Sequence, residues 1–288
     1  MLGSFLLTLA LQGEVVSFQC RAAREYITTY RYLKDHKEFS LNDEQVERIA
    51  FEVTKGCNGA AYRFTEAVNT LVKAQLDTAS AIRTGRDLAQ RNDGAAETFL
   101  TVFKASYASD VLDLPLIDAL AKAKQLSLNL NSIPPWLEED FRDLAFTCVE
   151  VLQLPRPKCA NFVTKLVYAA ARLQNDQGDH LDKGVAKAFH EGLDFLTQKD
   201  AGPKLARFDA LGILEEILLV SPYALAEFVD LYRFAVDKKD RPLPRGDAVE
   251  FAKGISKLVV QRSKVRNAKP GSEPVEEPQL PEASEARQ

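Results

Sequence analysis

Apolar residues recur along most of this chain with the spacing of an α-helix. One stripe follows i, i+3, i+4, i+7, i+8 and i+11, and comprises Phe141, Leu144, Ala145, Cys148, Val149 and Leu152. Comparable stripes run over 46–53 and 99–107. No segment shows the period-two alternation of a half-buried strand that would compete with them. The periodicity therefore predicts an all-α protein.

Breaks between the stripes indicate where helices begin and end. Prolines at 115, 134–135, 203 and 222 stand where helices can start without losing a hydrogen bond. Ser40–Asp43 resembles a variant capping box, with Asp in place of the usual Glu or Gln. Glu138, Glu139 and Asp140 follow Trp136 and suit the dipole of the helix that begins there. We expect helices over 14–36, 43–56, 59–76, 78–91, 94–108, 114–128, 135–152, 158–174, 180–197, 203–219, 222–236 and 247–262.

Short joints between these ranges favour antiparallel neighbours. The expected fold is a set of stacked antiparallel hairpins, an irregular α-solenoid of about 10–12 helices. This helical domain covers 13–264, with candidate halves at 13–131 and 132–264.

The two ends of the chain differ from this domain. Residues 1–12 are mostly apolar but too short to span a bilayer, so they are a candidate signal peptide or a buried apolar arm. Residues 265–288 carry four prolines and five glutamates without an aromatic residue, which predicts a disordered tail.

The four cysteines lie where hairpin geometry pairs them. Cys148 and Cys159 are centred on the proline-containing turn near 153, and Cys20 and Cys57 on the expected first turn near 38. Each pair is a disulfide candidate, although four small core residues would fit the same stripes. Two bridges would indicate an oxidising compartment, so we expect a periplasmic or secreted protein, with the cytoplasm as the alternative.

Composition and motifs limit the classes of function. A net charge of −4 argues against general nucleic-acid binding. His36, His180 and His190 lack zinc-finger spacing and no catalytic or cofactor motif is present, so we expect no metal, no cofactor and no enzymatic activity.

Three functions are compatible with these limits. We expect a non-enzymatic helical scaffold or adaptor that binds protein partners without a membrane span. One alternative is a small-molecule or lipid-binding domain with an apolar cavity lined by Phe162, Leu166, Phe208 and Phe228. The other is a hydrolase that uses His180 and His190 with nearby carboxylates.

Overall fold

The structure is a computed structural model that describes residues 21–91, 93–177, 184–198, 202–237 and 241–267. All regular elements in these residues are helical, as predicted. The chain divides into two compact units, Met1–Ala171 and Arg172–Gln288. This boundary lies inside one helix, later in the chain than the boundary expected at 131/132.

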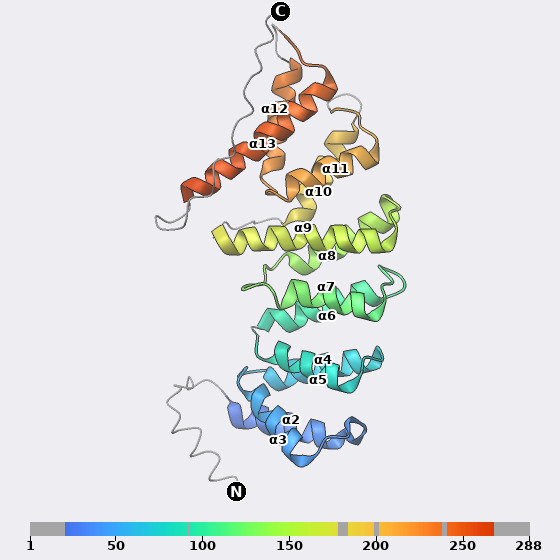
Figure 1. Cartoon of the computed structure of the whole chain (residues 1–288), viewed down its shortest axis with the longest axis vertical. Coiled ribbons are helices and arrows are strands. Elements are labelled where there is room, and N and C mark those ends of the chain that lie inside the picture. Colours follow the sequence, from blue (N-terminus) through green and yellow to red (C-terminus); the bar gives the residue numbers. More distant parts are fainter. Residues whose placement is uncertain (1–20, 92, 178–183, 199–201, 238–240, 268–288) are drawn as a thin grey trace, which may run out of the picture. The chain divides into compact units, whose positions relative to one another are not determined.

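Unit 1 is a series of helical hairpins (Figure 1). Its elements are α2 (Ala22–Asp35), the short 3₁₀ helix η1 (Lys37–Phe39), α3 (Asp43–Thr54), α4 (Ala60–Lys73), α5 (Thr78–Ala89), α6 (Asp93–Tyr107), α7 (Leu116–Ser127), α8 (Leu137–Phe146), the π-helical turn η2 (Thr147–Val151) and α9 (Arg156–Gln177). α9 continues into unit 2.

Successive hairpins of unit 1 stack in register. α2 packs on α3, α4 on α5 and α6 on α7, which forms the hairpins. The first helices of neighbouring hairpins also pack together, α2 on α4, α4 on α6 and α6 on α8. These first helices begin at Ala22, Ala60, Asp93 and Leu137, so the repeat length varies between 33 and 44 residues. This is the predicted irregular α-solenoid.

The apolar stripes face the inside of the stack. In α4 the buried side chains are spaced at helical intervals, namely Ala60, Ala61, Phe64, Ala67, Val68 and Leu71. The stripe of the helix predicted over 135–152 is likewise buried at Phe141, Leu144 and Cys148. Burial of these stripes in a continuous core holds the hairpins together, because no hairpin can cover its own apolar face.

One start signal is wrong in its register. α3 is capped by Asn42, whose side chain accepts a hydrogen bond from the Gln45 backbone N–H at 2.8 Å, while Gln45 Oε1 accepts from the Asn42 N–H at 2.9 Å. Ser40, the predicted cap, instead adopts a left-handed conformation with φ 54° at the end of η1. The true capping box is therefore Asn42–Gln45.

Two charged side chains fix the junction between the first two hairpins. Glu25 on α2 is 7% exposed, and its carboxylate accepts backbone hydrogen bonds from Gly59 at 3.2 Å and Ala61 at 2.8 Å, at the start of α4. This places a negative charge at a helix N-terminus, where the backbone dipole favours it.

Arg63 on α4 makes the complementary contacts. Its guanidinium is buried, with the residue 7% exposed, and donates to the carbonyls of Gly56 at 3.0 Å, Asn58 at 3.0 Å and Ala89 at 3.1 Å. Gly56 follows the end of α3 and Ala89 is the last residue of α5. One side chain thus satisfies the carboxyl-terminal ends of two helices.

The described residues of unit 2 form four further helices: α10 (Val185–Thr197), α11 (Arg207–Leu218), α12 (Ala224–Asp237) and α13 (Arg245–Asn267). α10 packs on α11 and α12 on α13. Gly192 on α10 is a point of close approach to α11 and α12, because a Cβ there would lie 2.4 Å from Leu214 Cδ2 and 2.9 Å from Leu225 Cδ1. Tight packing at Gly192 therefore joins the two hairpins.

The helix ranges agree with prediction apart from their ends. The predicted helix 14–36 begins at Ala22, and residues 14–20 lie outside the described residues, as do 1–12 and 180–183. The predicted helix 135–152 ends in the π turn η2, which the periodicity did not indicate. α13 extends to Asn267, past the expected start of the tail at 265, and residues 268–288 lie outside the described residues.

Candidate functional site: an acidic groove between two first helices

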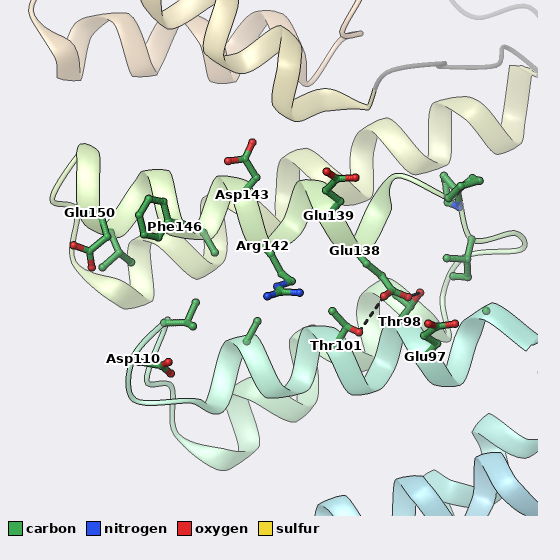
Figure 2. Close-up of a pocket in the computed structure, with 18 residues that line it drawn as sticks. Glu97, Thr98, Thr101, Asp110, Glu138, Glu139, Arg142, Asp143, Phe146 and Glu150 are labelled. Atoms are coloured by element: carbon green, nitrogen blue, oxygen red, sulfur yellow. Dashed lines mark hydrogen bonds between the residues drawn. The ribbon is translucent and has the colours of Figure 1, made fainter.

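An open groove of about 1090 Å³ runs along unit 1 between α6 and α8 (Figure 2). Its α6 side extends from Gly94 to Ala105, and its α8 side from Glu138 to Val149. The loop at Ile133–Pro135 closes one end, and Asp110 and Val111 line the other. Because the first helices run parallel in the stack, the groove follows both helices for about three turns.

The side chains along this groove are mainly acidic. Its lining contains six carboxylates and one guanidinium, a formal charge of −5, namely Glu97, Asp110, Glu138, Glu139, Asp143 and Glu150 with Arg142. The whole chain carries only −4. Figure 2 shows Glu138 and Arg142 directed toward α6, whereas Glu139 and Asp143 project from the other side of α8.

Glu138 links the two walls of the groove. Its Oε1 accepts a hydrogen bond from Thr98 Oγ1 at 2.9 Å, and its Oε2 accepts one from Thr101 Oγ1 at 3.0 Å. Thr98 is fully buried. The sequence assigned Glu138 only to the dipole of its own helix, but the structure also uses it to hold α8 against α6.

An exposed aromatic ring borders the groove where α8 ends. Phe146, the last residue of α8, is 60% exposed and borders the groove together with Val149 and Glu150 of the π turn. Phe146 and Cys148 are two residues apart, and residues at this spacing point to different faces of a helix. Phe146 therefore lies on the surface while Cys148 is buried.

Cys148 and Cys159 meet behind this end of the groove, but they are not bonded. Both residues are buried free thiols. Cys159 Sγ donates a hydrogen bond to the Leu154 carbonyl at 3.4 Å. The neighbouring Cys159 thiol, together with burial, raises the pKa of the Cys148 thiol. The two cysteines are therefore neighbours in this structure, but the predicted disulfide between them is absent from it.

Of the second predicted pair, Cys20 and Cys57, only Cys57 lies within the described residues. Cys57 lies between α3 and α4 with φ 54°, beside the carbonyls that Arg63 binds. Cys20 lies outside the described residues. The Cys20–Cys57 bridge stays a prediction.

The residues of the two alternative functions do not form a described site. His180 lies outside the described residues, and His190 on α10 makes an edge-to-face contact with Phe189. Of the residues expected to line an apolar cavity, Phe162, Leu166 and Phe228 are buried, but Phe208 on α11 is 68% exposed. Phe208 therefore lies on the surface of unit 2.

No helix in the described ranges combines the length and hydropathy needed to cross a membrane. Within the same residues, no three potential metal ligands of the His, Cys, Asp or Glu types come together.

Comparison with known proteins gives no relative for this chain. No protein-family model matches it, and neither the curated proteins nor the solved structures contain a match. The interpretation of the groove therefore depends on its own geometry and charge.

Proposed function

We propose that this protein is a non-enzymatic helical scaffold or adaptor that binds a protein partner along the α6–α8 groove. The observation that carries the proposal is the shape of the groove, which is long, open and bordered by exposed side chains of both helices, such as Glu97 and Phe146. Small-molecule sites usually enclose most of their ligand. An open channel between parallel helices is instead suited to an extended or helical segment of another protein.

The exposed Phe146 supports this interpretation. Aromatic side chains are frequent anchors of protein interfaces because they bury a large area on binding with little loss of conformational freedom. Phe146 stands at one end of the groove, next to Val149. An apolar side chain of a partner would bury both.

We further propose a periplasmic or secreted location with a Cys20–Cys57 bridge. Cys57 is not among the free cysteines of the described residues, which supports this pairing. Disulfides persist mainly in oxidising compartments. In such a compartment the neighbouring thiols of Cys148 and Cys159 could also be oxidised, so their oxidation state should be determined in protein from the native host.

Site-directed photo-cross-linking tests the proposed function. Phe146 is replaced by the photo-reactive analogue benzoylphenylalanine in full-length protein expressed in the native host, and adducts are identified by mass spectrometry after irradiation. The matched control is the same replacement at Phe208, which has a similar exposed fraction in unit 2.

We expect a small set of discrete protein adducts at position 146 that are absent at position 208. A protein partner held by the groove must lie within reach of the ring at 146. The proposal is rejected if both positions give the same adducts, or if position 146 gives none.

A further inference from the structure

We infer that the segment which occupies the groove is basic and amphipathic, with Lys or Arg residues flanking an apolar side chain that contacts Phe146. The inference rests on the proposed function and adds the chemistry of the partner. Three features of the groove support it: its length, its charge and the position of its aromatic ring.

The length of the groove determines the kind of ligand. From Gly94 to Ala105 along α6, and from Glu138 to Val149 along α8, the walls extend over eleven helical steps, about 17 Å. A metal ion or a small polyamine would leave most of this length empty. A helical segment of about three turns has the same length.

The charge of the groove determines the sign of the ligand. Even without Glu139 and Asp143, which project from the other side of α8, the lining keeps four carboxylates against one guanidinium. Such a lining repels an acidic segment and a nucleic-acid backbone, and attracts Lys and Arg side chains. The acids are distributed along the groove, with Glu97 near one end and Asp110 and Glu150 near the other. Basic residues on more than one turn of the partner would therefore each find a carboxylate.

The position of the aromatic ring adds a requirement for an apolar residue. Phe146 and Val149 form an apolar patch beside Glu150. A segment with only basic residues would leave this patch exposed to water, whereas an apolar side chain between basic residues would cover it. The recognised pattern is therefore amphipathic as well as basic.

Peptide binding to the full-length protein tests the inference. The probe is a fluorescein-labelled peptide of about twelve residues, three helical turns, with leucines at helical spacing and lysines elsewhere. Two reference peptides of equal length replace every lysine by glutamate or every leucine by serine. Fluorescence anisotropy measures all three affinities at low and high salt.

We expect the leucine–lysine peptide to bind at least about tenfold more tightly than either reference, and to weaken about tenfold when salt rises from roughly 0.05 to 0.5 M. Phe146→Ala should weaken this peptide about tenfold and leave the serine–lysine peptide unchanged. The double variant Asp110→Asn with Glu150→Gln should weaken both lysine peptides about threefold to tenfold.

Matched control variants locate the binding site. Phe208→Ala removes an equally exposed ring outside the groove, and Glu44→Gln with Glu47→Gln removes two exposed acids of α3. Both should leave the affinity within about twofold. Equal effects of control and groove variants would overturn the inference, because binding would then be general charge attraction.

The outcomes separate this inference from the proposed function. Preference for the glutamate peptide, or no binding of any peptide, would overturn the basic amphipathic partner. Discrete adducts at position 146 would still support a protein partner of different chemistry in that case. Binding of the leucine–lysine peptide with the expected loss in Phe146→Ala would support the inference directly.

Discussion

Removal of the Arg63 side chain should strongly destabilise unit 1. Its guanidinium donates three hydrogen bonds of 3.0–3.1 Å to backbone carbonyls at a buried junction. A hydrogen bond to a charged group contributes about 1.5–3 kcal/mol, so the three together could contribute about 4.5–9 kcal/mol. Entry of water and relaxation of the helix ends should recover part of this, and we expect Arg63→Ala to lower the free energy of unfolding by about 3–5 kcal/mol.

Tryptophan fluorescence during urea unfolding measures this loss in the appropriate unit. Trp136 is the single tryptophan of the chain and precedes α8 in unit 1, so its signal reports the unit that contains Arg63. Arg63→Lys should lie between the wild type and Arg63→Ala, because a lysine keeps the charge but not the planar fork that reaches several carbonyls at once.

Arg48→Ala is the matched control, since Arg48 is an exposed arginine of α3 in the preceding hairpin of the same unit. It should change the free energy of unfolding by no more than about 0.5 kcal/mol. If Arg63→Ala proves as mild as this control, the carbonyls must be equally well satisfied by water, and the structural role given to Arg63 is refuted.

Three further outcomes follow from the packing, the titration and the cysteines. Gly192→Ala should destabilise unit 2 by about 1–3 kcal/mol, measured by calorimetry, because its Cβ would clash with two leucines. Gly212→Ala, in open space on α11, should instead stabilise the unit by up to about 1 kcal/mol. An effect of the same sign in both variants would contradict the close approach at Gly192. Burial raises the pKa of Tyr32 to about 12 from 10.0, so the folded state holds the phenol proton more tightly than the unfolded state does. The contribution of this proton to the free energy of unfolding is complete below pH 10 and is lost between about pH 10 and 12. Tyr32→Phe should remove this part of the alkaline loss of stability, measured by urea unfolding at a series of pH values. Alkylation of the unfolded, unreduced protein should label two cysteines, Cys148 and Cys159, and alkylation after reduction should label all four. If mass spectrometry maps the two labels to other cysteines, Cys148 and Cys159 are not the free pair.

The sequence predicted the helices well because each of them has a local cause. The period of the apolar residues is a property of short segments, and burial of stripes such as that of α4 follows from it. The errors lie at helix ends, where several residues compete for one role. Asn42 and Ser40 can both cap a helix, and only the backbone conformation shows that Asn42 does so.

The candidate site could not be predicted in the same way. The walls of the groove come from two hairpins, and the bonded residues Thr98 and Glu138 are 40 positions apart. No local pattern relates such positions, since their distance is set by how the hairpins stack. The proximity of Cys148 and Cys159 could be predicted, because it depends only on their equal distances along the chain from the turn between them.

The junction held by Glu25 and Arg63 has a direction. α3 and α5 end where α4 begins, so carbonyl oxygens and N–H groups meet at one edge of the stack, and each charged side chain binds backbone groups of the opposite polarity. Exchange of the two residues, Glu25→Arg with Arg63→Glu, keeps the same pair of charges but presents each of them to groups of its own sign. Such an exchange can rescue an ordinary salt bridge. Here it should fail, because the polarity of the peptide groups, and not the attraction between two side chains, decides which charge each position accepts.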